Sequence, residues 1–84
     1  MLELKDTCKM MESKDFKERF RAEYFQVKIR TKKLEAMLEK YKVGVLQFCP
    51  NCSYEILFEQ LVYMKQYLRT LEERAKIENI GLEE

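Results

Sequence analysis

Residues 16–43 decide the fold, and they read FKERFRAEYFQVKIRTKKLEAMLEKYKV. Apolar or weakly polar side chains recur at alternating steps of four and three residues, at Phe20, Tyr24, Val27, Thr31, Leu34, Leu38 and Tyr41. This heptad spacing lines one side of a helix. Asp15 and Glu18 resemble a capping box at its start, and Gly44 is the residue type favoured just past a helix end. We therefore predict a helix over about residues 15–43.

The same spacing returns toward the C-terminus, at Leu57, Leu61, Met64, Leu68, Leu71 and Ala75. It predicts a second helix over about residues 54–80, capped by Ser53 and ended by Gly81. The link between the helices, about residues 44–53, contains Pro50, which blocks continuation of a helix. Two long helices joined by a short link form an antiparallel hairpin, so the expected fold is all-α.

The hairpin accounts for residues 15–80, with residues 1–14 as an N-terminal arm and residues 81–84 as a tail. Apolar side chains remain that one partner helix cannot cover: Phe25, Ile29 and Ala36 in the first helix, and Ile56, Phe58, Val62, Tyr63 and Tyr67 in the second. Exposed stripes of this length mark interfaces. We therefore predict a symmetric homo-oligomer. The alternative is that the arm folds back and covers these stripes.

Composition excludes several classes of protein. The 84 residues include no histidine and only two glycines, so the commonest general base and a glycine-rich phosphate loop are both missing. We do not expect an enzyme. No apolar run is long enough to span a membrane, and the first residues do not resemble a signal peptide, so we expect an intracellular protein. The net charge of +1, with basic residues spread around the helix, argues against a nucleic-acid polymer as partner.

The link carries the one compact chemical motif, Cys49-Pro50-Asn51-Cys52. Two cysteines at this spacing can grip a metal or form a redox pair. A structural zinc needs four ligands, which two chains meeting at their links could supply together. We favour a simple turn over an intermolecular zinc or a redox site, and we expect no other cofactor.

A second constellation is a stripe on the second helix, formed by Gln60, Tyr63, Tyr67, Thr70 and Arg74. Aromatic rings can stack on bases, an amide can read a base edge, and a guanidinium can meet phosphate. Such a face suits a flat, anionic ligand or, alternatively, an oligomer interface. The first helix adds a basic stretch, which is either an anion site or a solvated face: Lys28, Arg30, Lys32, Lys33, Lys40 and Lys42.

Several short strings together resemble a family of small bacteriophage hairpin proteins related to a crAss-phage protein. In the first helix these are Phe16-Lys17-Glu18-Arg19, Glu23-Tyr24 and Lys33-Leu34-Glu35, and after the link they are Glu59-Gln60-Leu61, Met64, Tyr67-Leu68, Leu71 and Arg74. Some members of that group are similar to anti-CBASS nucleotide sponges, which bind cyclic di- or trinucleotide signals without cleaving them. The longer link with its Cys-Pro-Asn-Cys motif departs from the family pattern.

The resemblance implies an oligomeric counter-defence protein acting in the cytoplasm of an infected bacterial cell. It implies ligand pockets shared between protomers. By position, the candidate ligand-binding residues are Gln60, Met64, Tyr67 and Arg74, with Arg19 facing them from the first helix. The charge argument adds Lys33. The alternative is a helical protein-interaction module, an inhibitor or adaptor that docks on a host protein.

Overall fold

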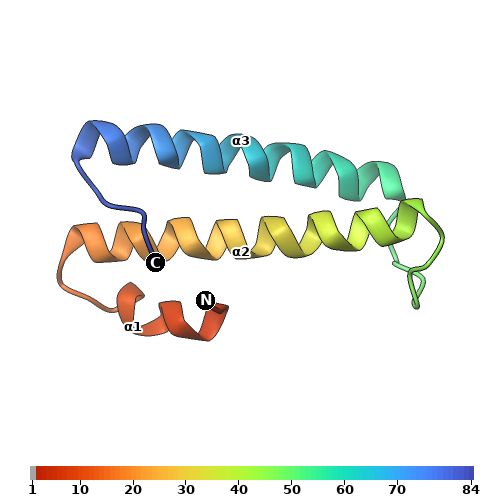
Figure 1. The fold of residues 1–84 in the computed structure, drawn as a ribbon, viewed down its shortest axis with the longest axis horizontal. Coiled ribbons are helices and arrows are strands. Elements are labelled where there is room, and N and C mark those ends of the chain that lie inside the picture. The colour runs from red at the N-terminus through yellow and green to blue at the C-terminus, as the bar shows by residue number, and fades with distance from the viewer. Residues whose placement is uncertain (1) are drawn as a thin grey trace.

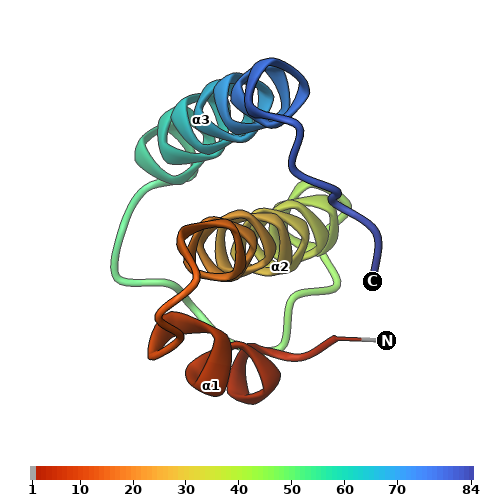
Figure 2. The same ribbon diagram turned by 90° about the vertical axis from the view of Figure 1, so that its left-hand side faces the viewer.

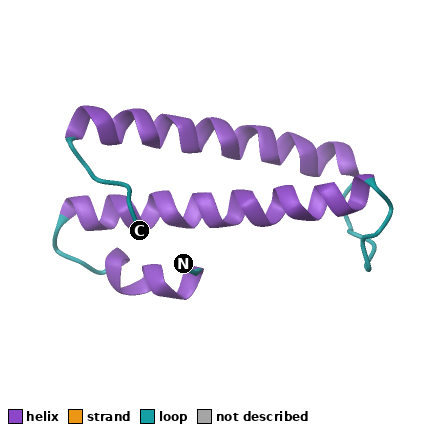
Figure 3. Ribbon diagram, viewed as in Figure 1, coloured by secondary structure: helices purple, strands orange, loops and turns teal. Residues whose placement is uncertain are grey.

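The computed structural model describes residues 2–84 and consists of helices and their connections (Figures 1 and 3). The helical elements are η1 (Leu4–Thr7), α1 (Cys8–Met11), α2 (Phe16–Lys42) and α3 (Tyr54–Glu78). The helices α2 and α3 lie side by side and antiparallel along the long axis of the molecule (Figure 1). The all-α fold and the two-helix hairpin are therefore confirmed.

Two polar side chains fix the start of α2. The Asp15 carboxylate accepts a hydrogen bond from the Lys17 amide at 3.0 Å, as an N-cap does. Glu18 does not complete the expected capping box, because the Asp15 amide donates instead to the Ser13 hydroxyl at 3.0 Å. That hydroxyl in turn donates to the Glu18 carboxylate at 3.2 Å. At the other end, Gly44 follows the helix in the left-handed region, with φ +79°, as predicted.

The second helix begins as predicted and ends earlier than predicted. The Ser53 hydroxyl accepts from the Ile56 amide at 3.3 Å and caps the start of α3. The predicted terminator Gly81 is wrong, because α3 ends at Glu78 and Asn79 takes the left-handed conformation with φ 57°. Asparagine tolerates that region better than most residues. The turn at Asn79 lets Ile80 fold back, where its side chain is buried.

The core lies near the end of the hairpin that carries both termini. Its buried members come from both long helices and the tail: Phe20, Tyr24, Phe25, Leu71, Ala75 and Ile80. Half-buried apolar side chains of the arm, the tail and the two helices pack against them: Leu2, Met10, Val27, Leu68 and Leu82. The core therefore joins four segments that are far apart in the sequence.

The arm folds back along α2 on the side opposite α3, so that α2 is the middle layer of three (Figure 2). A buried hydrogen-bonded threonine fastens it. The Thr7 hydroxyl donates to the Leu4 carbonyl at 2.7 Å and accepts from the Gln26 side-chain amide at 2.9 Å. Residues 2–14 are thus helical in part and belong to the packed structure, whereas their sequence shows no sustained helical period.

The folded-back arm accounts for only part of the apolar surface that the two-helix hairpin cannot cover. On α2, Phe25 is buried and Ile29 is half-buried, as the alternative of a folded-back arm required, whereas Ala36 is exposed. On α3 the stripes stay open: Tyr63 is 61% exposed and Tyr67 44% exposed, and Phe58 and Val62 are exposed on the other flank. The homo-oligomer, which was predicted from the apolar stripes of both helices, stays a prediction.

Candidate functional site

An open groove follows one flank of α3. It has a volume of about 350 Å³ and is lined by Ile56, Glu59, Gln60, Tyr63, Met64 and Tyr67. These positions are three or four residues apart, so helical geometry stacks them on one side of α3. All of them belong to one helix, and the groove is therefore a furrow with an open side. We call this surface the α3 groove.

The floor and rim of the α3 groove combine soft, flat and polar groups. Gln60 and Met64 meet through a 3.7 Å contact from the amide nitrogen to the sulfur. The rings of Tyr63 and Tyr67 are two of the more exposed aromatic groups of the chain. Polarizable sulfur and exposed rings are suited to stacking on flat ligands, and the Gln60 amide offers both a donor and an acceptor.

The groove continues toward the C-terminal end of α3 as a polar cluster. The Tyr67 hydroxyl donates a hydrogen bond to the Glu23 carboxylate of α2. The Arg74 guanidinium donates to the Glu78 carboxylate at 2.8 and 3.4 Å. It also lies over the Phe20 ring, 4.8 Å from the ring centre to the guanidinium carbon, a cation–π arrangement. Tyr67 and Arg74 are therefore held in place by their own chain.

The pKa values of Tyr67 and Arg74 are both shifted by their neighbours in this cluster. The hydrogen bond to Glu23 is the main cause that raises the pKa of Tyr67, followed by burial. The pKa of Arg74 is also raised, first by its hydrogen bond to Glu78, with smaller contributions from Glu23 and Tyr67. Both groups thus keep their protons near neutral pH, Tyr67 as a neutral donor and Arg74 as a cation.

The structure brings together three of the six predicted ligand-binding residues and places the others elsewhere. Gln60, Met64 and Tyr67 line the α3 groove, and Arg74 lies two helical turns beyond Tyr67. Arg19 donates to the Ser13 carbonyl at 2.7 Å, in the connection that precedes α2. Lys33 is exposed on α2 and is not among the residues that line the groove.

Sequence reasoning missed the two carboxylates of the cluster. The Arg74–Glu78 pair has the i, i+4 spacing at which helical side chains meet, so that contact was readable from the sequence. The Glu23–Tyr67 contact joins residues 44 positions apart. It depends on how far α2 and α3 are shifted along each other, which spacing within one helix does not reveal.

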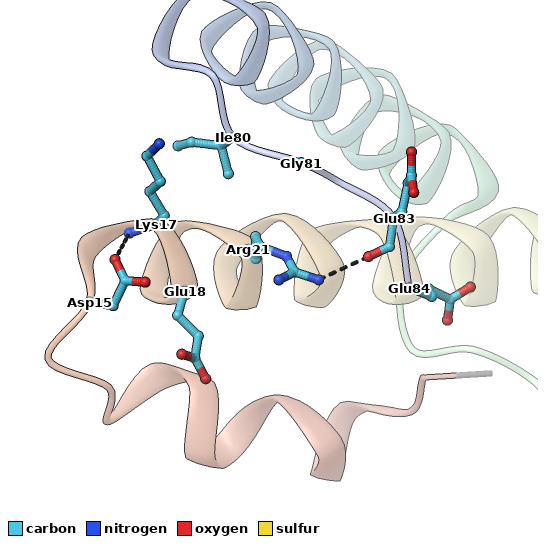
Figure 4. A pocket seen from close by; sticks show the side chains of 8 residues that line it. All are labelled: Asp15, Lys17, Glu18, Arg21, Ile80, Gly81, Glu83 and Glu84. Atoms are coloured by element: carbon cyan, nitrogen blue, oxygen red, sulfur yellow. Dashed lines mark hydrogen bonds between the residues drawn. The ribbon is translucent and has the colours of Figure 1, made fainter.

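A larger hollow of about 560 Å³ lies where the tail crosses the start of α2 (Figure 4). It is lined by Asp15, Lys17, Glu18, Arg21, Ile80, Gly81, Glu83 and Glu84. Its two cations already hold the tail: Lys17 donates to the Asn79 carbonyl at 3.2 Å, and Arg21 to the Glu83 carbonyl at 2.9 Å. Carboxylates outnumber these cations among the residues that line the hollow, and both cations are already engaged by the tail.

The Cys49–Cys52 motif lies in the link, and both thiols are exposed. Cys8 begins α1, near the opposite end of the hairpin (Figure 1). Within residues 2–84, no group of three or more histidine, cysteine, aspartate or glutamate side chains is placed to hold a metal ion. Zinc shared between two chains stays a prediction. Among the same residues, no helix is both long and apolar enough to cross a bilayer.

Comparison with known proteins gives one family. Residues 14–77 match the protein family named Sequestin, and this range includes all of α2, the link and nearly all of α3. The chain belongs to the Sequestin family. Sequestins are phage proteins that sequester cyclic nucleotide signals, and the family is non-catalytic. No curated protein and no solved structure is similar enough to the chain to count as a match.

The Sequestin match confirms the coarse part of the resemblance drawn from the sequence, a phage protein that sequesters cyclic nucleotides. The closer likeness to crAss-phage hairpin proteins stays a prediction, as does the identity of the nucleotide. Every residue that lines the α3 groove, together with Glu23 and Arg74, lies inside the matched range. Most of the arm and the whole tail lie outside it.

Proposed function

We propose that this Sequestin binds a cyclic di- or trinucleotide in the α3 groove and holds it without cleaving it. Membership of the Sequestin family carries the proposal, because it supplies the ligand class. The groove supplies the matching chemistry. Tyr63 and Tyr67 offer ring faces for bases, Gln60 offers an amide for a base edge, and Arg74 offers a guanidinium for a phosphate.

A second copy of the chain completes the groove in this proposal. A furrow on one helix leaves most of a ligand in water, whereas ligand sites usually bury the larger part of a ligand's surface. The same stripe on a second copy, related by a two-fold axis, would supply the opposite wall and a second set of rings. The exposure of Tyr63 and Tyr67 supports this arrangement.

Sequestration needs affinity and requires no reaction. A protein that removes a signal by binding must be present in at least the amount of the signal, and it must release the signal slowly. Stacking and charge-assisted hydrogen bonds provide affinity without a nucleophile or a general base. The family's non-catalytic character agrees with this mechanism.

The proposal is tested by screening the purified chain against cyclic dinucleotides, cyclic trinucleotides and cyclic ADP-ribose variants. A ligand that binds the folded state raises the melting temperature by mass action, and calorimetry then gives its affinity. Heat denaturation followed by chromatography should return the ligand intact. No binding across the whole panel, or recovery of a linear product, contradicts the proposal.

Variants locate the site. We expect Tyr67→Ala or Arg74→Ala to weaken nucleotide binding by about tenfold or more, because each removes a stacking or charge-assisted contact. Tyr41→Ala and Arg69→Ala are matched controls outside the groove, and they should bind as the parent does. Circular dichroism should show the same helix content in all four. Normal nucleotide binding by the Tyr67 and Arg74 variants would place the site elsewhere.

The other flank of α3 favours a second candidate function, a protein-interaction module. Phe58 and Val62 are exposed there, four residues apart, and they present an apolar strip with no polar tip. Such a strip fits a groove on another protein. Under this alternative the chain ignores nucleotides, and capture from host lysate depends on Phe58 and Val62 and is insensitive to Tyr67→Ala.

A further inference from the structure

We propose that Glu23 and Glu78 occupy, in the free chain, the positions that the ligand's anionic groups take when it binds in the α3 groove. The two carboxylates then compete with the ligand for Tyr67 and Arg74. They lower the affinity of the chain for the ligand and set the minimum negative charge that a ligand needs. This inference rests on the proposed function, since it concerns the same groove. It assigns a role to two residues that were not among the ligand-binding candidates predicted from the sequence.

The contacts that carry the inference pair every donor of the cluster with a carboxylate. Glu23 comes from α2 and accepts the Tyr67 hydroxyl, while Glu78 comes from α3 and accepts two bonds from the Arg74 guanidinium. A carboxylate and a phosphate present the same kind of acceptor oxygens to such donors. A phosphate can therefore use Tyr67 and Arg74 only after it displaces these two side chains.

The charge of the cluster makes displacement necessary. One guanidinium faces two carboxylates, so the free cluster carries a net negative charge. An anion that approaches Arg74 also comes close to that negative charge, and like charges at close range repel. Both carboxylates are half-buried side chains at the surface, so they can swing out into water. The Arg74–Glu78 ion pair and the Tyr67–Glu23 hydrogen bond both lie at the surface, where such contacts are weak, and an anion with better geometry can replace them.

The positions of the donors indicate the class of ligand. Tyr67 and Arg74 are seven residues apart, which is roughly 10 Å along a helix. A single phosphate reaches one of the two donors well, whereas a ligand with two or more phosphates can displace both carboxylates at once. The groove is therefore expected to discriminate against mononucleotides, because these would remove one carboxylate and still meet the charge of the other.

The test compares charge-neutral, nearly isosteric variants: Glu23→Gln, Glu78→Gln and the control Glu73→Gln. Glu73 is a matched control, because it pairs with Arg69 at the same i, i+4 spacing on the same helix, with an N–O distance of 3.6 Å. Each variant removes one negative charge, so any general effect of net charge appears in all three. The probes are the tightest cyclic nucleotide of the screening panel and inorganic pyrophosphate, which has no base to stack.

We expect Glu23→Gln and Glu78→Gln each to tighten binding of both probes by about threefold to tenfold over the parent. Glu73→Gln should change the affinity less than twofold. Calorimetric titrations of the four proteins at one fixed salt concentration measure these ratios, and circular dichroism checks that each variant is folded.

The outcomes separate this inference from the proposed function. If the parent binds a cyclic nucleotide and Glu78→Gln behaves as Glu73→Gln does, the inference fails and the function stands. Weaker nucleotide binding by Glu23→Gln also overturns it, because Glu23 would then be a ligand contact. If none of the four proteins binds any cyclic nucleotide, the proposed function itself fails.

Discussion

Substitution of Leu71 by alanine tests the packing of α3 against α2 and the tail. Leu71 is 2% exposed and belongs to the core cluster with Phe20, Tyr24 and Ile80. A buried Leu→Ala change removes the transfer free energy of the side chain and leaves a cavity, which together cost about 3–4 kcal/mol. Alanine has the higher helix propensity, so the loss comes from packing and cannot come from the helix itself.

This loss is large for a chain of this size. At about 0.05–0.15 kcal/mol per residue, a domain of 84 residues has a free energy of unfolding on the order of 4–12 kcal/mol. A loss of about 3 kcal/mol should therefore lower the melting temperature by roughly 12–24 °C, since about 1 kcal/mol corresponds to roughly 4–8 °C in a domain of this size. Circular dichroism measures the melting temperature, and urea titration measures the free energy of unfolding.

Ile77→Ala is the control, because Ile77 lies on the same helix and is 81% exposed. It should change the free energy of unfolding by less than about 0.5 kcal/mol. Equal losses for Leu71→Ala and Ile77→Ala would refute the assignment of Leu71 to the core. If only Ile77→Ala shows a loss, and that loss grows with protein concentration, a contact between copies buries Ile77 and the single-chain account of α3 is wrong.

Two further predictions concern buried hydroxyl groups. Burial and then the hydrogen bond to Glu72 raise the pKa of Tyr24 to about 12, so the folded chain holds this proton more tightly than the unfolded chain. The free energy of unfolding should therefore fall as the pH rises from about 10 to 12, and this part of the fall should be missing in Tyr24→Phe, as urea titrations at about pH 9 and 11 would show. Thr7→Val should cost about 1–2 kcal/mol, because it leaves the Leu4 carbonyl and the Gln26 amide without their partner. The hydroxyl of Thr70 is exposed, so Thr70→Val should leave the free energy of unfolding nearly unchanged in the same urea titration. An equal loss for the two variants would contradict the role given to the Thr7 contact.

Most of the fold could be predicted from two features of the sequence: the helical period of the apolar residues and the residue types that start and end helices. The bounds of α2 differ from the prediction by one residue at each end, because Asp15 and Gly44 act through local chemistry that a sequence displays. The end of α3 was placed too late because the prediction took Gly81 as the residue that ends the helix, whereas the chain already turns at Asn79, before Ile80. The Ile80 side chain meets the core after the chain has turned at Asn79.

The periodicity of the sequence could not predict the short helical elements or the contacts between distant segments. The helices η1 and α1 have four residues each, too few to show a period. A capping box between Glu3 and Asp6 marks the start of η1 and could have been read from their spacing. For the site, helical spacing placed Gln60, Tyr63 and Tyr67 on one stripe, and the family resemblance added Met64; all four line the α3 groove. Arg19 could not be placed, since its side chain turns to the connection before α2.

The two open flanks of α3 differ in a way that bears on what covers each of them. The flank with Tyr63 and Tyr67 ends in hydroxyl groups, and such rings can stand in water as well as under a ligand. The flank with Phe58 and Val62 has no polar tip, so its exposure costs free energy until another surface covers it. A surface that must load and release a small anion needs the first kind of chemistry, and a lasting protein contact needs the second. The tyrosine flank is therefore the better place for a nucleotide held between two copies of the chain, and the Phe58 flank is the better place for a contact with a different protein.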